Sequence, residues 1–408
     1  MNLLLLPLLG TAATLRVGVD APTAQAAVDL AQVGDTVLLP PGDWPGPVVI
    51  DRAITLGSEG GTTKGGWLVG GGEGHVVLVN APGTVIDGLN VRNSGVDRIH
   101  EDACIRLSRG SDGSTVRDSV VRECLYGIAV WETSGVSLIG NRVDGRPEIR
   151  SADRGNGIHL FGSHHLLVQG NTVTRARDGI YVSSTNDSVI RDNVASDQRY
   201  GIHYMWSHRN EVSGNVTRDN NGGIALMESR GLVVTHNVAS HNRHHGILFR
   251  DVLECRIEDN LAEDNSEGMF FFGAIDNTIA RNRVRGNQIG ARIWTGNERN
   301  IIADNDFVGN RTQIYYVSMR DEVWEGEGGR NHWSDYIGWD QDGDGLGDRP
   351  YRIDSLLAGL LYKVPAAVLL LNSPTLELLR QAQALLPALR VPTITDAQPR
   401  MRARPVTP

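Results

Sequence analysis

A repeat of about 22 residues constrains this chain more than any other feature of its sequence. Each copy has a glycine, then about a dozen residues with short β-branched runs, then an asparagine 14 or 15 residues after the glycine. The glycines of the clearest copies are Gly157, Gly179, Gly201, Gly223, Gly246, Gly268 and Gly290. A unit this short, with no helical period and no leucine-rich consensus, favours one coil of a β-helix.

The predicted fold is therefore all-β, a right-handed parallel β-helix over residues 14–335. Successive coils stack at the ordinary strand spacing of about 4.8 Å. Asparagines that recur in register can bond to the amides above and below them, so we expect a structural ladder rather than a catalytic set. The stretch "TAQAAVDLAQVGDTVLLPPGDW" predicts a short helix and then a first strand that cover the open N-terminal end.

The two ends of the chain read differently from the repeat. The start "MNLLLLPLLGTAATLRV" resembles an export signal over residues 1–13, and the alternatives are a frayed first strand or a misplaced start codon. Over residues 336–408 we expect an Asp-rich loop and two amphipathic C-terminal helices, which either cap the far end or bind a partner. Cys104, Cys124 and Cys255 are odd in number, so export to an oxidising compartment implies at least one free thiol.

The side chains after each glycine alternate between two faces. Positions one and three are apolar throughout, which places them inside and places positions two and four outside. The outer positions carry aromatic residues, methionine and histidine where a solvated face would be polar, which is typical of a partner or ligand surface. The candidate partner surface consists of Phe161, Tyr181, Phe270, Phe272 and Trp294.

One part of this outer face has the ligands of a soft metal. Met205 and Met227 occupy equivalent positions on adjacent coils, and His203 lies two residues before Met205. Thioether and imidazole ligands together favour Cu(I) over hard cations. The alternative is that these three side chains only belong to an aromatic contact surface.

A second metal-like motif is the loop "DQDGDGLGD". Asp340, Asp342, Asp344 and Asp348 stand at positions one, three, five and nine of a calcium-type loop. Position twelve is Tyr351, where a bidentate Glu is usual. The motif predicts a structural Ca²⁺ site, and the alternative is a turn in which the Asp side chains cap backbone amides.

Several function classes are disfavoured. A net charge of −9 without a basic run predicts no attraction to nucleic acid or to anionic lipid. Glycosidases need paired carboxylates, whereas Glu132 and Glu228 are isolated. No phosphate-binding glycine loop occurs, so any ATP use belongs to another chain. The sequence therefore predicts a protein that is not an enzyme.

Several segments resemble the NosD family of periplasmic β-helix proteins, from about residue 20 to the C-terminus. The most specific are "GIHYMWSHRNEVSGN", "NHWSDYIGWDQDGDGLGDRPYR" and "LLNSPTLELLRQAQALLPALRVP". The resemblance implies a periplasmic accessory subunit of an ABC transporter whose permease and ATPase are separate chains. It implies a role in building the copper-sulfide centre of nitrous oxide reductase, alongside a copper chaperone lipoprotein, with membrane contact only through the permease.

Other readings keep the fold and change the function. A secreted carbohydrate-binding or carbohydrate-cleaving β-helix would use the aromatic outer column to stack sugars. A scaffold for the reductase without a ligand of its own differs from the copper hypothesis only in metal binding. The sequence leaves open whether the cargo of the transporter is copper or a sulfur species.

Overall fold

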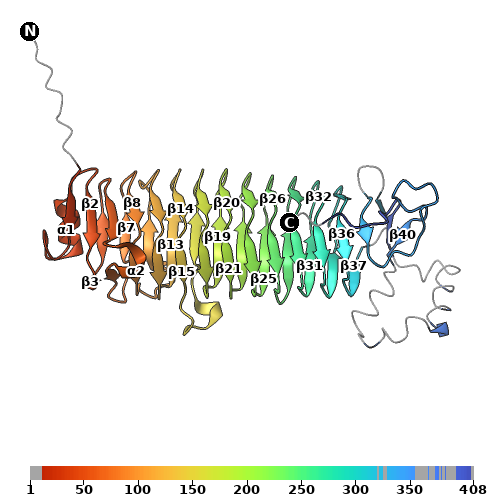
Figure 1. Cartoon of the computed structure of the whole chain (residues 1–408), viewed down its shortest axis with the longest axis horizontal. Helices are drawn as coiled ribbons and strands as arrows, with labels where there is room; N and C mark the ends of the chain where they lie inside the picture. The colour runs from red at the N-terminus through yellow and green to blue at the C-terminus, as the bar shows by residue number, and fades with distance from the viewer. Residues whose placement is uncertain are drawn as a thin grey trace, which may run out of the picture. The chain divides into compact units, whose positions relative to one another are not determined.

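The computed structural model describes residues 12–318, 321–324, 329–353 and 392–405, together with positions 366, 373–375, 378 and 382. The chain divides into two units, Met1–Tyr181 and Val182–Pro408. Each unit is a parallel β-helix in which three sheets run along the stacked coils (Figure 1). The predicted fold class is confirmed. Nowhere in these ranges does a helix have the length and apolar character needed to cross a membrane.

In the first unit the strands are short, and each pairs in parallel with the equivalent strand of the next coil. The first sheet contains β1 (Thr14–Arg16), β2 (Thr36–Leu39), β5 (Thr55–Ser58), β8 (Val85–Asp87), β11 (Thr115–Arg117), β14 (Ser137–Ile139) and β17 (Leu167–Gln169). The second sheet contains β4 (Val48–Ile50), β7 (Val77–Val79), β10 (Ala103–Leu107), β13 (Tyr126–Trp131) and β16 (Ile158–Phe161). The third sheet contains β3 (Asp43–Pro45), β6 (Trp67–Val69), β9 (Asn90–Arg92), β12 (Val120–Arg122), β15 (Arg142–Asp144) and β18 (Thr172–Thr174). The strand β19 (Asp178–Ser183) spans the division between the units.

The second unit repeats this plan. Its first sheet contains β20 (Val189–Arg191), β23 (Glu211–Ser213), β26 (Val233–Thr235), β29 (Arg256–Glu258), β32 (Thr278–Ala280) and β35 (Ile301–Ala303). Its second sheet has the longest strands: β22 (Tyr200–Met205), β25 (Gly222–Met227), β28 (His245–Arg250), β31 (Glu267–Phe272), β34 (Ile289–Ile293) and β37 (Thr312–Tyr316). Its third sheet contains β21 (Val194–Ser196), β24 (Val216–Arg218), β27 (Val238–Ser240), β30 (Leu261–Glu263), β33 (Arg283–Arg285), β36 (Asp306–Val308) and β39 (His332–Trp333).

The helix predicted near the N-terminus is confirmed. The helix α1 (Ala24–Leu30) begins after Thr23, whose side chain accepts a hydrogen bond from the amide of Ala26. It contacts β2 and β4 at the first coil. The strand β1 precedes it and pairs with β2; it lies within the N-terminal stretch for which a first strand was the alternative interpretation. A short helix α2 (Gly61–Lys64) and a 3₁₀ turn η1 (Ser151–Asp153) occupy loops between strands of the first unit.

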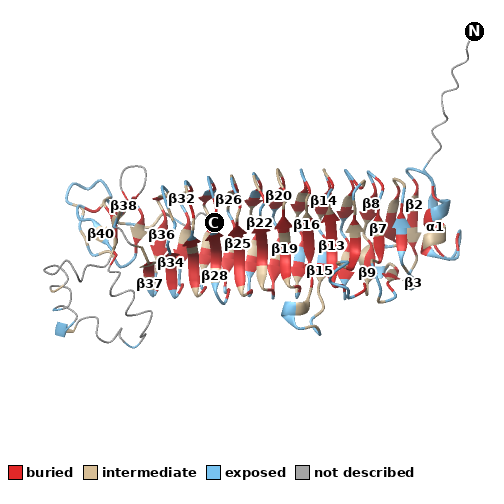
Figure 2. Cartoon of the chain, turned by 180° about the vertical axis from the view of Figure 1, so that it is seen from behind, coloured by how far each residue is buried: buried red, intermediate tan, exposed pale blue. Residues whose placement is uncertain are grey.

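The asparagine ladder predicted from the repeat is confirmed in the second unit. Each amide nitrogen donates to the amide oxygen on the next coil over 2.9–3.0 Å. The ladder consists of Asn193, Asn215, Asn237, Asn260, Asn282, Asn305 and Asn331. These side chains are buried, and hydrogen bonding to equivalent residues satisfies them. Figure 2, which is coloured by burial, shows that buried residues run along the strands of the coils.

The C-terminal residues close the second unit. The strand β41 (Ile394–Asp396) lies between β38 (Glu322–Trp324) and β40 (Tyr351–Arg352) in a small sheet. Asp396 accepts hydrogen bonds from the backbone amide and the side chain of Asn331, and so ends the asparagine ladder. The predicted export signal falls mainly on residues 1–11, and the predicted C-terminal helices fall mainly on residues 354–391; both lie largely outside the described residues.

The three cysteines form one disulfide and leave one free thiol. Cys104 and Cys124 form a disulfide, and Cys255 is a buried free thiol, which confirms the expectation of at least one unpaired cysteine. The backbone amide of Cys255 donates a hydrogen bond to Asn277 Oδ1 at 2.9 Å. The equivalent position is Leu232 on the preceding coil and Asn277 on the next one.

Candidate functional site

The outer face of the second sheet in the second unit carries the candidate copper ligands. The predicted alternation is confirmed, because the inward positions of β22, Ile202 and Tyr204, are fully buried. The expectation that the outward positions meet solvent is wrong for several of them: His203 is 6% exposed and Met227 is 7% exposed. They are covered because bulky side chains of the same outer face pack over one another.

This packing forms a defined apolar group, here named the outer cluster. Its buried members are Ala225, Met227 and Leu248, and partly buried Tyr200, Met205 and Phe270 pack against them. Met205 and Met227 are direct register partners between β22 and β25. The structure therefore brings together the two thioethers that the repeat spacing predicts.

His203 belongs to the neighbouring row of the same face. Its register partner on β25 is Ala225, and it lies two residues before Met205 on β22. Two thioethers and one imidazole are neutral, polarizable donors, which is the donor set that suits Cu(I). The residues present thus fit Cu(I) in their chemistry.

The side chains that hold His203 were not found from the sequence. Arg199 Nη2 lies 3.3 Å from His203 Nδ1, and the Tyr200 ring centroid lies 4.9 Å from that of His203. Since a guanidinium can only donate, Nδ1 of His203 is the acceptor in this contact. A metal that binds Nδ1 must therefore displace Arg199. Arg199 and Tyr200 directly precede Gly201 and the candidate ligands His203 and Met205, and this position in the sequence could have indicated their contact with His203.

A charged network lies further along the same face. The carboxylate of Glu267, which is buried, contacts His245 Nδ1 at 2.9 Å and Arg292 Nη1 at 2.9 Å. The Arg292 guanidinium also lies 5.5 Å from the centre of the Trp294 ring. Arg292 is buried, and the Glu267 carboxylate neutralises its charge there. Glu267 directly precedes the repeat glycine Gly268, and its role in this network was not predicted from the sequence.

The candidate partner surface is only partly exposed. In the second unit Phe272 is 37% exposed and Trp294 is 39% exposed, whereas Phe270 packs on the outer cluster. In the first unit Phe161 and Tyr181 are half-buried: Phe161 stacks 4.4 Å from Trp131, and Tyr181 lies 5.1 Å from His159. Phe272 and Trp294 are therefore the accessible aromatic members.

The first unit holds an unexpected buried imidazole at the equivalent outer position. His159 packs between the rings of Tyr126 and Tyr181. Burial lowers the pKa of His159 to about 3, so the imidazole is neutral at physiological pH. Its Nδ1 lies 3.3 Å from the amide of Asn156.

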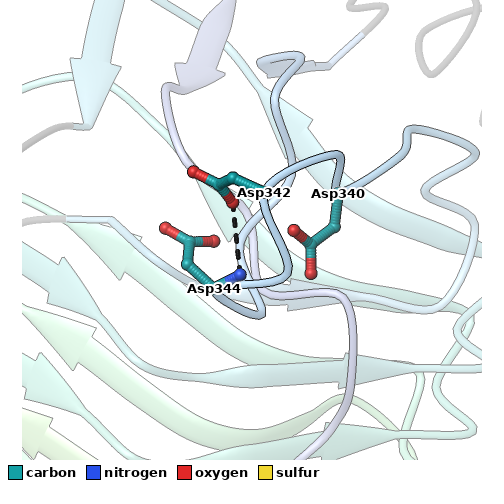
Figure 3. A group of neighbouring side chains, drawn as sticks. All are labelled: Asp340, Asp342 and Asp344. Carbon is teal, nitrogen blue, oxygen red and sulfur yellow. Dashed lines mark hydrogen bonds between the residues drawn. The ribbon is translucent and has the colours of Figure 1, made fainter.

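The Asp-rich loop gathers three of the four predicted carboxylates. Carboxylate oxygens of Asp340, Asp342 and Asp344 lie within 4.8 Å of one another. Figure 3 shows the three side chains on the same loop. Asp348 is not a member of this group; its Oδ2 accepts the Gln341 amide at 2.6 Å. The amide-capping alternative is observed for Asp340, which accepts hydrogen bonds from the amides of Gly343 and Gly345. Although partial burial raises it, these hydrogen bonds hold the pKa of Asp340 below its usual value.

The two outer-face glutamates considered for catalysis have other contacts. Glu132 pairs with Arg109, and Glu228 accepts a hydrogen bond from the indole of Trp206. Glu132 belongs to the first unit and Glu228 to the second. Neither is paired with a second carboxylate across a groove among the described contacts.

Comparison with known proteins identifies relatives along most of the chain. A family model described as "Periplasmic copper-binding protein (NosD)" matches residues 139–338. A protein from Pseudomonas aeruginosa named probable ABC transporter binding protein NosD is 38% identical over 375 residues, covering 88% of this chain and 87% of its own. A protein of the same name from Stutzerimonas stutzeri is 35% identical over 379 residues, covering 89% and 86%.

Solved structures share the fold at low identity. The A-module of the mannuronan C-5 epimerase AlgE6 from Azotobacter vinelandii has a TM-score of 0.57 and 17% identity, covering 72% of this chain and 92% of its own. The DFA-IIIase from Arthrobacter chlorophenolicus has a TM-score of 0.50 and 14% identity, covering 68% and 86%. At these identities the likeness shows the β-helix fold alone.

Proposed function

The chain belongs to the NosD family, and from this we propose that it is a periplasmic accessory subunit of an ABC transporter. In this role it assists assembly of the copper centre of nitrous oxide reductase and relays Cu(I) from a copper chaperone lipoprotein. The names of its relatives support the transporter association, and the family description supports the periplasmic location and the binding of copper. The permease and ATPase are other chains.

The observation that carries the copper part is the pairing of Met205 with Met227 across adjacent strands. Neutral thioethers bind Cu(I) without adding charge, and the apolar outer cluster around them penalises the more highly charged Cu(II). A site with weak thioether ligands and one imidazole is suited to passing an ion on rather than keeping it. Copper bound at Nδ1 of His203 would displace the Arg199 guanidinium from that nitrogen.

The partner surface is proposed to lie beside this site. Phe272 and Trp294 are large, partly exposed aromatic side chains; Phe272 ends β31 and Trp294 directly follows β34, and both strands belong to the sheet of the outer cluster. Exposed aromatic residues are frequent at the centre of protein interfaces. We assign them to docking of the copper chaperone or of nitrous oxide reductase.

A role without catalysis agrees with the carboxylates of the outer face. Glu132 and Glu228 are each engaged by a neighbouring side chain, and they lie in different units. Glycoside hydrolysis requires two carboxylates that flank one bond. The proposal is therefore a binding protein.

The experiment is an anaerobic Cu(I) titration of the purified protein against a competing chelator. Met205→Leu with Met227→Leu removes both thioethers and preserves the volume of the outer cluster, so we expect the variant to fold and to lose tight binding. Met269→Leu is the matched control, because it removes a thioether that is buried inside β31. Wild-type affinity in the triple variant His203→Ala, Met205→Ala, Met227→Ala would refute the copper site.

A specific observation also keeps carbohydrate binding as a second candidate: the exposed Phe272 and Trp294 could stack a sugar ring. A glycan-binding screen of wild type and Trp294→Ala separates the two functions. Saturable binding lost in Trp294→Ala would favour the sugar, and its absence would favour the protein interface.

The Asp-rich loop is proposed to hold a structural Ca²⁺. Its support is the close approach of the three carboxylates of Asp340, Asp342 and Asp344. Oxygen ligands from such a loop are the donors that Ca²⁺ prefers. The ion would fix the loop next to the C-terminal residues that line the same cavity, Arg400 and Met401.

A further inference from the structure

The outer face of the second sheet in the first unit gathers buried polar atoms that lack a hydrogen-bond partner within the described ranges. They belong to side chains on or just before three adjacent strands, β10, β13 and β16. The atoms, here named the polar cluster, are Glu101 Oε2, Arg106 Nη1, Trp131 Nε1, Asn156 Oδ1 and His159 Nε2. Buried polar atoms in proteins are almost always hydrogen-bonded, so this concentration points to a ligand that supplies the missing contacts.

Three members of the polar cluster lie close together. Glu101 Oε2 is 3.7 Å from Arg106 Nη1, which is too long for a hydrogen bond, and the Arg106 guanidinium carbon is 4.5 Å from the centre of the Trp131 ring. Burial raises the pKa of Glu101, and the charge of Arg106 and the indole N–H of Trp131 oppose that rise. A carboxylate, a guanidinium and an indole N–H therefore share one space, and each has an atom without a partner.

The other two members are more than nine-tenths buried. His159 is 5% exposed and Asn156 is 7% exposed. The Asn156 amide nitrogen lies 3.3 Å from His159 Nδ1 and donates to it, because burial keeps the imidazole neutral. The proton of the imidazole is then on Nε2. His159 thus has a donor without an acceptor, and Asn156 has an acceptor without a donor.

These two members adjoin the first three. Arg106 and His159 are both register partners of Ala129, on opposite sides of β13. The centre of the His159 ring is 6.0 Å from that of Trp131. Besides burial, the nearby charge of Arg106 lowers the pKa of His159. The polar cluster is therefore one group of side chains.

Ring stacking does not explain this group. The Trp131 ring is contacted by Arg106 at 4.5 Å and by the Phe161 ring at 4.4 Å, and these residues come from the strands on either side of β13. Both sides of the indole are thus occupied, whereas a sugar that stacks needs a free ring face. Recognition must depend on the polar atoms.

The polar atoms present opposite charges side by side. The donors are Arg106, Trp131 and His159, and the acceptors are Glu101 and Asn156. A simple anion would meet the Glu101 carboxylate, and a simple cation would meet the Arg106 guanidinium. A ligand that carries both charges on neighbouring atoms complements the pair.

We propose that the polar cluster binds a free amino acid as its zwitterion. The carboxylate of the ligand accepts from Arg106, Trp131 and His159, and its ammonium group, which has three donors, donates to Glu101 and Asn156. The side chains of Glu101 and Arg106 are 19% and 15% exposed, so the ligand enters from the outer face. The site lies in the first unit and is independent of the proposed copper ligands.

The test is isothermal titration calorimetry of the full-length protein with glycine, the smallest such zwitterion. We expect saturable binding at one site per chain, with a Kd of about 1 mM or below. Acetate and methylammonium, which each carry one of the two charges, should bind at least about tenfold more weakly, and so should the neutral polyol glycerol. Absence of saturable glycine binding, or equal affinity for any one of these three probes, overturns the proposal.

Two variants test the assigned contacts. Glu101→Gln keeps the size of the side chain and removes its charge, so we expect the affinity for glycine to fall about tenfold. Trp131→Phe keeps an aromatic ring and removes an N–H that has no partner within the described chain, so the protein should fold and bind glycine severalfold more weakly.

Trp67→Phe is the matched control. Trp67 belongs to the same unit, and its ring also lies near arginines, with Arg92 at 5.5 Å and Arg122 at 5.6 Å. We expect its replacement to leave the affinity for glycine unchanged. Trp131→Phe decides the outcome if Glu101→Gln fails to fold: an affinity equal to that of Trp67→Phe overturns the proposal.

Discussion

Burial decides the charge of His159, a residue that the repeat places on the outer face. The sequence correctly predicts that the side chain of His159 points to the outer face, because side chains alternate between the two faces of a strand. It does not reveal that Tyr126 and Tyr181 enclose the imidazole, since these residues come from other coils. The pKa of about 3 follows from that enclosure.

His159 predicts a specific pH dependence of stability. Its folded pKa of about 3 lies below the ordinary 6.5, so between these values the unfolded chain binds a proton that the folded chain does not. Stability is therefore complete above about pH 6.5 and falls toward acid by about 1.4 kcal/mol per pH unit. Urea unfolding between about pH 4 and about pH 6 measures this slope.

The variant His159→Gln should lower the slope of unfolding free energy against pH by about 1.4 kcal/mol per pH unit, which corresponds to the loss of one titrating proton. Its stability at neutral pH is compared with wild type to separate the lost packing from the lost titration. Equal slopes in the two proteins would mean that His159 is protonated in the folded state.

Cys255 predicts chemical protection. Burial raises the pKa of the Cys255 thiol to about 11, above the ordinary 9, so the reactive thiolate is about a hundredfold rarer. We expect iodoacetamide to label no cysteine of the native oxidised protein and to label Cys255 alone after unfolding without reductant. Mass spectrometry of the labelled peptides provides the measurement, and labelling of Cys104 or Cys124 in the same sample would contradict their disulfide.

At the scale of the element, the asparagine ladder stabilises each turn. Asn237 donates to Val212 O and to Asn260 Oδ1, and its own Oδ1 accepts from Asn215. Asn237→Ala leaves several buried groups without partners, so we expect a loss of about 3 kcal/mol in the free energy of unfolding.

Thr235→Ala is the matched control for the ladder. Thr235 lies two residues away on β26 and is half-buried, so its truncation should cost about 0.5 kcal/mol or less. Urea unfolding compares the two variants. An equal, small effect of both variants would show that the hydrogen bonds of the ladder add little to the free energy of unfolding, compared with the hydrogen bonds that the amides form with water in the unfolded chain.

The Asp-rich loop predicts a difference between two of its carboxylates. Asp342 belongs to the close trio, whereas Asp348 caps the Gln341 amide. Ca²⁺ should raise the Tm of the wild type, and Asp342→Asn should weaken its affinity about tenfold or more. Asp348→Asn should retain most of the affinity for Ca²⁺. An equal loss of affinity in both variants would show that Asp348 is also a Ca²⁺ ligand.

At the scale of the whole molecule, the repeat explains why so much of the fold could be predicted. A period of about 22 residues determines which side chains share a row, so the pairing of Met205 with Met227 follows from spacing alone. The small sheet of β38, β40 and β41 could not be predicted in this way. It joins segments more than 40 residues apart that carry no repeat.

The covering of the outer face was likewise beyond the sequence. Whether Met227 meets water depends on the sizes of Tyr200, Leu248 and Phe270, which lie on three different strands. Alternation gives the side of the sheet but not the packing between neighbouring rows. Arg199 and Glu267, which contact His203 and Arg292, are missed for the same reason.

The copper relay is the central claim, and the coordination of the bound ion tests it most directly. Copper K-edge absorption of the protein loaded anaerobically with one equivalent of Cu(I) reports the neighbours of the metal. The account predicts two sulfur atoms and one nitrogen, with sulfur lost in Met205→Leu, Met227→Leu and retained in Met269→Leu. An ion surrounded by nitrogen and oxygen alone, unchanged in the double variant, would contradict it.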